Sequence, residues 1–379
     1  MPRSPRSLAR AHRLALPRLA LPRLIFARLI LPRLIFARLI LPRRILPRLI
    51  LPRLIFARLA LPRLALPRFI LAPLVALAAC GRAQAPEPRW EAAPPLLHPR
   101  AAHAVVSAGD ALYAIAGTGR DGAPVLPIER FDGAAWREVS TLPGPGLNAP
   151  AAVAIDRRIF VIGGFDTTTN IPSDRVMVFD LDRGEWSEST PLPAPRGGHA
   201  AAVLDGEIHV LGGGNQRSTL ADHDVFDPTA GAWRPRAPLP RSEGSPAAVV
   251  HRGVLHAIGG RSGPADFGAV DRYDAAADRW TEGPPIPPRA TVGAALVCGE
   301  LHVFGGESQA RRATLDEALR LVDDARWEPI PAMPTARAFA RAAIFDGDVH
   351  VVGGTLTPQV SHAPEGSAVV ERLRVKCRE

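Results

Sequence analysis

The hydrophobic pattern of most of the chain consists of short stretches in which apolar and smaller or polar residues alternate up to a glycine pair. The six copies read LYAIAG (112–117), IFVIGG (159–164), IHVLGG (208–213), LHAIGG (255–260), LHVFGG (301–306) and VHVVGG (349–354). Short apolar runs bounded by Gly, Pro and Asp are typical of β-strands. Paired glycines allow a positive φ where the chain leaves a crowded strand end. The pattern therefore predicts six equivalent β-strands.

Two further features recur in register with these strands. Tryptophan starts another predicted strand in every copy: Trp90, Trp136, Trp186, Trp233, Trp280 and Trp327. An aromatic–Asp strand precedes the Trp in four copies, ERFD (129–132), MVFD (177–180), DVFD (224–227) and DRYD (271–274), whereas LRLVD (319–323) and VVERLRV (369–375) replace it later. With an Ala/Val-rich strand such as AAAVLD (200–205), each repeat supplies four strands. A period in this range indicates a propeller or solenoid, in which each sheet covers its faces with its neighbours.

These features together resemble the kelch repeat, and the resemblance extends over residues 89–376. It implies an all-β fold, a six-bladed β-propeller of four-stranded antiparallel blades. The repeat region begins with a Trp strand that lacks its three partners (RWEAAPPL, 89–96) and ends with VVERLRV, which no Trp follows. We therefore expect the N-terminal strand to join the last blade and close the ring.

Residues 1–68 are a low-complexity repeat of Arg, Leu and Pro, to which we assign no fold. Arg recurs at every fifth residue from Arg13 to Arg68. In a helix this spacing would place Arg on every face, and the recurrent Pro would break the helix. No apolar run approaches the roughly 20 residues that a membrane span needs. We interpret the segment as a disordered repeat or as the product of a start codon placed too far upstream; a basic membrane-surface segment is the alternative.

Residues 69–80 have the pattern of a secretory signal. The apolar run FILAPLVALAA (69–79) follows Arg68 and ends in small residues. Its end, LAAC (77–80), resembles the bacterial lipobox, which implies lipidation of Cys80; a cleaved signal with a chance Cys is the alternative. Residues 81–88 would then form a tether. Gly81 is not the acidic residue associated with inner-membrane retention, so we expect a cell-envelope lipoprotein of the outer membrane or periplasm.

The positive charge of the chain belongs to its N-terminal part. Residues 1–79 contain 16 Arg and no acidic residue, which leaves 30 basic and 37 acidic residues in 80–379. A nucleic-acid site needs its basic residues on the domain that binds. We therefore expect no nucleic-acid partner, and membrane contact only through the lipid anchor.

One position before the innermost strand of each repeat carries a charge in five of the six copies. Its occupants are Arg100, Arg196, Glu243, Arg289 and Arg337, with Leu147 in the second repeat. The position follows a Leu-Pro or Met-Pro turn in several repeats, so we expect it to face the mouth of the central channel. There, guanidinium groups could bind an anionic or carboxylate-bearing ligand. The alternative is a framework role, in which they donate to backbone carbonyls of the turn.

The sequence supplies no pattern of a catalytic or metal site. His209, His256, His302 and His350 share one strand position with Tyr113 and Phe160, which indicates packing. No phosphate loop, GxSxG elbow or metal-ligand cluster occurs, so we expect no cofactor and no metal. Kelch propellers include a copper-radical oxidase family, whose paired Tyr and His ligands and Tyr-linked Cys have no counterpart here. They also include a sialic-acid epimerase family, which uses a six-bladed ring.

Cys298 and Cys377 are candidates for a disulfide. Cys298 lies in a turn between two predicted strands of the fifth repeat, and Cys377 follows the last strand of the sixth. Both ends should lie on the same face of neighbouring blades, where oxidation joins them if their Cα atoms come within about 7 Å.

We expect a non-enzymatic binding protein with a protein, peptide or glycan ligand. Variable segments follow the glycine pairs and should form the binding face. These segments are 165–175, 214–222, 261–269, 307–317 and 355–367. The alternative is a sugar-acid epimerase or mutarotase-like carbohydrate enzyme that uses the Arg-rich channel mouth.

Overall fold

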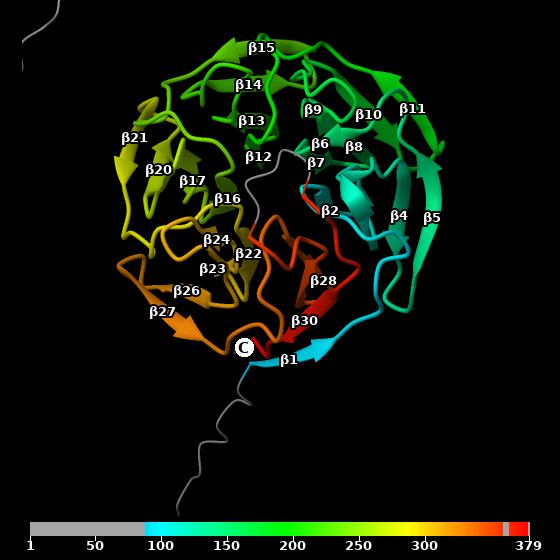
Figure 1. Ribbon diagram of the computed structural model, residues 1–379. Coiled ribbons are helices and arrows are strands. Elements are labelled where there is room, and N and C mark those ends of the chain that lie inside the picture. The colour runs from blue at the N-terminus through cyan, green and yellow to red at the C-terminus, as the bar shows by residue number, and fades with distance from the viewer. Residues whose placement is uncertain (1–87, 359–363, 378–379) are drawn as a thin grey trace, which may run out of the picture. The chain divides into compact units, whose positions relative to one another are not determined.

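A computed structural model describes residues 88–358 and 364–377, which form six four-stranded antiparallel sheets arranged around a central axis (Figure 1). The prediction of an all-β, six-bladed propeller is confirmed. The predictions for residues 1–68, for the signal and lipobox at 69–80 with Cys80, and for the tether up to residue 87 lie outside the described residues. Among the described residues, no helix has the length and apolar character needed to cross a membrane.

Each blade runs from an inner strand beside the axis to an outer strand at the rim. Blades one to three are β2 (Ala104–Ala108), β3 (Ala111–Ile115), β4 (Pro127–Phe131) and β5 (Trp136–Thr141); β7 (Ala151–Ile155), β8 (Arg158–Ile162), β10 (Val176–Asp180) and β11 (Glu185–Glu188); and β12 (Ala200–Leu204), β13 (Glu207–Leu211), β14 (His223–Asp227) and β15 (Ala232–Pro235). Blades four and five are β16 (Ala247–His251), β17 (Val254–Ile258), β20 (Val270–Asp274) and β21 (Arg279–Glu282); and β22 (Gly293–Val297), β23 (Glu300–Phe304), β26 (Ala318–Val322) and β27 (Arg326–Ile330).

Blade six closes the ring with strands from both ends of the repeat region. It contains β28 (Arg341–Phe345), β29 (Asp348–Val352) and β30 (Val370–Arg374), and its outer strand is β1 (Arg89–Ala92). β1 lies beside β30 (Figure 1). The two strands pair antiparallel, with Trp90 opposite Leu373. The expected ring closure is confirmed.

The hydrophobic core lies between the blades. Six buried clusters each combine residues of two neighbouring blades; one of them joins Phe131 and Trp136 of blade one to Val352 and Val370 of blade six. Five of the tryptophans donate their indole N–H to a backbone carbonyl at the end of the preceding blade's outer strand, at 2.8 to 3.0 Å. Trp186 instead donates to the Ser140 hydroxyl at 3.0 Å. The repeated Trp therefore joins each blade to the one before it.

The glycine pairs adopt the positive φ that their sequence predicts. In blade one the second glycine is Gly117, with φ of 89°, where a Cβ would lie 2.6 Å from the Ala101 carbonyl oxygen. The first position of that pair is Ala116, which is buried and has φ of 60°. An L-residue with a Cβ is strained in this region, so Ala116 departs from its five glycine counterparts at an energetic cost.

The segments after the glycine pairs form short additional elements on one face, which we call the loop face. They include β9 (Phe165–Asp166), paired with β6 (Leu147–Asn148); the hairpin β18 (Arg261–Ser262) and β19 (Ala265–Asp266); and the hairpin β24 (Glu307–Ser308) and β25 (Ala313–Thr314). A 3-10 turn, η1 (Arg120–Gly122), follows the glycine pair of blade one.

Candidate functional site

A belt of backbone hydrogen bonds surrounds the mouth of the channel on the loop face. Each blade contributes one residue with φ between 48° and 62°: Ala102, Ala149, Gly198, Ser245, Thr291 and Phe339. From Ala149 to Phe339, each of these donates its N–H to the carbonyl of the preceding belt residue, at 2.6 to 3.2 Å. Positive φ is uncommon outside glycine, and for β-branched Thr291 it is a marked outlier. Inter-blade bonding therefore holds a strained backbone at the mouth, and such strain is concentrated at functional sites in proteins.

A depression with a volume of about 460 Å³ lies over this belt. Its floor includes the belt residues Ala149, Gly198, Ser245 and Phe339. Its walls come from the loop-face segments of five blades: Phe165, Asn215, Gln216, Arg217, Ser218, Thr219, Arg261, Gly263, Gln309 and Pro364. All five variable segments that the sequence predicts for the binding face thus contribute to the wall, and segment 355–367 does so through Pro364. The volume lies within the usual range of small-molecule sites.

Polar side chains of the wall are positioned by local turns and by contacts between blades. The Asn215 side-chain oxygen accepts the backbone N–H groups of Arg217 and Ser218, at 2.8 and 2.9 Å. This turn leaves Gln216 and Arg217 exposed. Thr219 of blade three contacts Ser262 of blade four through their hydroxyl groups at 2.8 Å. The loops of neighbouring blades therefore support one another.

The two guanidinium groups of the wall differ in their availability. Arg261 is partly buried, and it pairs with Glu307 at 2.6 Å and with Asp266 at 3.4 Å. Arg217 is exposed and forms no ion pair with any described residue. Arg217 is therefore the cation of the wall that can pair with an anionic ligand group.

The four Arg residues expected at the channel mouth are buried inside the blades. Each donates to a carboxylate at 2.6 to 2.7 Å, and the pairs are Arg100–Glu129, Arg196–Asp224, Arg289–Glu317 and Arg337–Glu371. Each also donates to backbone carbonyls. None of the four lines the depression. The four Arg residues therefore have the framework role. Their guanidinium groups are buried and are not accessible to an anionic ligand in the depression.

Glu243, the fifth residue of that set, is also buried. In the other charged blades an Arg at this position pairs with a carboxylate of the blade. In blade four the corresponding carboxylate, Asp271, pairs instead with Arg241. Burial and then the neighbouring Asp271 raise the pKa of Glu243 to about 8, against the opposing effect of Arg241. The carboxyl group is therefore protonated at neutral pH, and Glu243 does not line the depression.

The strand histidines pack inside the blades, as their shared position indicates. His209 and His223 contact each other through Nδ1 and Nε2 at 2.9 Å, and His223 Nδ1 donates to the Ala237 carbonyl. Burial lowers the pKa of His209 to about 4 and, with the effect of His209, that of His223 to about 3. Both rings are therefore neutral at physiological pH. Among the described residues, no group of three or more His, Cys, Asp or Glu is placed to hold a metal ion.

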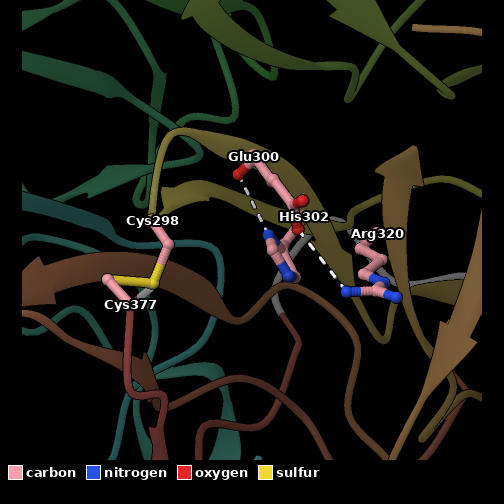
Figure 2. The surroundings of a disulfide bond; sticks show 5 residues. All are labelled: Cys298, Glu300, His302, Arg320 and Cys377. Carbon is pink, nitrogen blue, oxygen red and sulfur yellow. Dashed lines mark hydrogen bonds and ion pairs between the residues drawn. A yellow bond between two sulfur atoms is a disulfide. The ribbon is translucent and has the colours of Figure 1, made fainter. Parts of the chain in front are cut away.

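Cys298 and Cys377 form a disulfide, with their Cα atoms 5.1 Å apart (Figure 2). The bond joins the turn between β22 and β23 to the segment that follows β30. β23 follows this turn directly, and within it His302 Nδ1 donates to the Glu300 carbonyl at 3.0 Å (Figure 2). The disulfide therefore connects blade five to the C-terminal end of blade six.

Comparison with known proteins gives a family profile, the KLHDC2/KLHL20/DRC7 Kelch-repeats domain, which matches residues 102–286. The chain is 30% identical to Kelch-like protein 35 of Mus musculus over 125 residues, which is 33% of this chain and 21% of that protein. It is 33% identical to N-acetylneuraminate epimerase of Haemophilus influenzae (strain PittEE) over 113 residues, 28% of this chain and 29% of the epimerase. The match thus spans less than a third of either relative. A solved structure described as "Structure of YjhT" superposes with a TM-score of 0.62 at 16% identity, covering 73% of this chain and 95% of that one, and shows the fold alone.

Proposed function

This chain is a kelch-repeat β-propeller, and from that premise we propose that it is an exported, lipid-anchored protein that binds a protein, peptide or glycan ligand. The ligand occupies the depression over the channel mouth and is not chemically altered. The observation that carries the proposal is this depression of about 460 Å³, built from variable loops on a rigid ring. Binding residues are disproportionately found on loops that a rigid scaffold positions.

The chemistry of the wall suits a hydrophilic ligand that carries a carboxylate. Exposed Arg217 provides a charged, planar donor for such a group. The amides of Gln216 and Gln309 and the hydroxyls of Ser218 and Thr219 provide donors and acceptors for hydroxyl or peptide groups. Phe165 and Phe339 add apolar surface against which a sugar ring or a side chain can pack.

The same wall favours binding over catalysis. Among the described residues that line the depression, the ionisable side chains are Arg217 and Arg261. A guanidinium group stays protonated at all physiological pH values, so it cannot exchange protons with a substrate. General acid–base catalysis needs a group with a pKa near the working pH, within hydrogen-bond reach of the reacting atom.

Export and lipid anchoring rest on the signal-like run 69–79 and on Cys80. The disulfide between Cys298 and Cys377 supports an oxidising compartment, because such bonds are rare in reducing ones. Mass spectrometry of the mature N-terminus tests this part: we expect a chain that begins with lipidated Cys80. A mature chain that begins at Met1, or an unmodified Cys80, contradicts the anchor.

Binding is tested by probing arrays of acidic glycans and peptides with the purified protein. We expect a carboxylate-bearing ligand whose affinity falls about 10- to 100-fold in the Gln216→Ala/Arg217→Ala variant, because one charged hydrogen bond contributes that much. The matched control is Arg183→Ala, which removes an exposed Arg from the turn between β10 and β11. An equal loss in both variants, or none in either, contradicts the depression as the site.

A second candidate is a sugar-acid epimerase or mutarotase-like activity. The observation that favours it is the 33% identity over 113 residues to a protein named N-acetylneuraminate epimerase. NMR spectroscopy of N-acetylneuraminate with catalytic amounts of the protein tests it. Exchange between the sugar's anomers faster than in buffer, lost in the Arg217→Ala variant, would establish this activity in place of simple binding.

A further inference from the structure

The channel below the belt is lined almost entirely by small apolar side chains of the six inner strands. The part next to the loop face is a cavity of about 120 Å³ whose walls include Ala152, Ala201, Ala248 and Ala342. Towards the opposite face the channel continues between Ala, Val, Leu, Ile and Ser side chains, none of which can carry a charge. Any charged group in this channel therefore stands out from its surroundings.

Arg341 is such a group, and it lies at a position where the other blades carry small residues. This is the first residue of the inner strand, which pairs with the residue just before the glycine pair. Its counterparts in the other blades are Ala104, Ala151, Ala200, Ala247 and Gly293. The small counterparts leave the space around the axis for the side chain of Arg341, which lines the cavity.

The positive charge of Arg341 is not balanced by the protein. Among the described residues, no carboxylate lies within ion-pair distance of it, and its one hydrogen bond is a long one of 3.5 Å from Nη1 to the Ala340 carbonyl. Arg100, also on the loop-face side of its blade, differs, because it donates to Glu129 at 2.6 Å. The remaining N–H groups of Arg341 are thus free to bind a ligand in the cavity.

The other titratable group of the cavity, His199, adds no second positive charge. His199 is held neutral, since burial and the nearby Arg196 lower its pKa to about 3. Nearby His103 is neutral too, because burial and then Arg100 lower its pKa well below the ordinary value. Burial lowers the pKa of Arg341 itself only to about 10, so its guanidinium remains charged at neutral pH. Arg341 is partly buried among apolar walls, and a charge without a partner in such a place is unfavourable.

We infer that the central channel binds one small monovalent anion, a halide or a small carboxylate such as formate, on the guanidinium of Arg341. The cavity of about 120 Å³ accommodates an anion of this size and is too small for a sugar acid, whose sites usually exceed about 300 Å³. Arg341 is partly exposed to the channel, and the narrow apolar walls strengthen the pairing because less water screens it there than in bulk solvent. This site is separate from the ligand depression and does not depend on the proposed function.

Thermal unfolding of the full-length protein in sodium salts of one ionic strength tests the inference. Chloride and formate enter the cavity, whereas gluconate does not. We expect the Tm of the wild type to be a few degrees Celsius higher in saturating chloride or formate than in gluconate, because a ligand of the folded state alone stabilises it. Titrating chloride and formate separately gives, for each anion, the concentration at which half of the Tm increase is reached. The anion with the lower concentration binds more tightly.

Variants separate an anion site from a structural role of the Arg341 side chain. In Arg341→Met the difference between salts should vanish, and in gluconate the variant should be at least as stable as the wild type. Arg183→Met, the matched control at an exposed site, should keep the difference. A Tm of Arg341→Met that is lowered equally in every salt overturns the inference, since Arg341 would then only fill space.

A direct measurement covers the case in which Arg341→Met does not fold. Chloride NMR line broadening by the wild type reports bound chloride without any substitution. We expect broadening that formate reverses, and retention of both effects in Arg341→Lys at lower affinity. Broadening that formate does not reverse, or none beyond that of buffer, contradicts the site.

Discussion

Leu147 and Met177 occupy, in blade two, the two positions at which Arg100 and Glu129 form a buried ion pair in blade one. Met177 pairs with Val161 in the sheet as Glu129 pairs with Ala114, which places them at equivalent positions. Both apolar residues are buried and belong to the same hydrophobic cluster. Blade two thus replaces both charges of the ion pair together, by two apolar side chains that fill the same space.

We predict that the apolar pair can be transferred to blade three. Arg196→Leu alone should lower the free energy of unfolding by about 3–5 kcal/mol, because it leaves the buried Asp224 carboxylate without its guanidinium. The double variant Arg196→Leu/Asp224→Met should recover most of that loss, as replacing a buried ion pair by apolar residues is often neutral. Urea unfolding of the single and double variants measures this. A double variant less stable than either single one would contradict the framework role.

Ala116 gives a second prediction. Its φ of 60° is the conformation in which the other five blades have glycine. Ala116→Gly should therefore raise the free energy of unfolding by about 0.5–1 kcal/mol, the relief of strain exceeding the entropy lost by glycine on folding. Gly163→Ala, in which the new Cβ would lie 2.6 Å from the Arg196 carbonyl oxygen, should destabilise. Calorimetric unfolding of both variants checks the opposite signs.

The buried Glu243 should make the free energy of unfolding depend on pH. The folded protein keeps the Glu243 proton up to a pKa of about 8, whereas the unfolded chain releases it near 4.5. The favourable contribution is complete below pH 4.5 and is lost as pH rises to about 8, by up to ~1.4 kcal/mol per pH unit. Glu243→Gln removes this loss, so its stability advantage over the wild type should grow from pH 5 to 8 and then level off.

Urea unfolding at several pH values measures that difference. The exposed Glu185→Gln serves as the control and should show no such growth. A stability difference between Glu243→Gln and wild type that is the same at pH 5 and pH 8 is inconsistent with a buried, protonated Glu243.

The disulfide should make the Tm of the protein depend on reductant. It closes a loop between cysteines 79 residues apart, for which chain entropy gives a stabilisation of about 4.5 kcal/mol. Dithiothreitol should therefore lower the Tm of the wild type, and it should leave the Cys298→Ser/Cys377→Ser variant unchanged at a lower Tm. If reductant has no effect on the wild type although the thiols become accessible to alkylation, the bond contributes nothing to stability.

The blades could be predicted from the sequence because several features recur at one spacing, and Trp90 without its partners indicated how the ring closes. The direction of a side chain could not be predicted in the same way. Arg100 and its counterparts precede the inner strand in sequence, yet they turn into the blade, where a carboxylate of the third strand meets them. The sequence feature that could have indicated this is Glu129 and its equivalents. These acidic residues lie opposite an Ala or Val of the second strand, as Glu129 lies opposite Ala114.

The belt was not predictable from local sequence. Thr291 and Phe339 disfavour positive φ, and only the hydrogen bonds between blades impose it. Arg341 was overlooked for a different reason. A single Arg at the start of a strand is ordinary, and it stands out only when aligned with the small residues of the other five blades.

The central claim is that the ligand binds in the depression over the channel mouth. Amide hydrogen exchange of the protein, with and without the ligand selected on the arrays, tests it most directly. We predict slower exchange on binding in residues 215–219, 261 and 263, which line the depression. Slower exchange instead at the turns of the opposite face, such as Asp205–Gly206 between β12 and β13, would contradict the account.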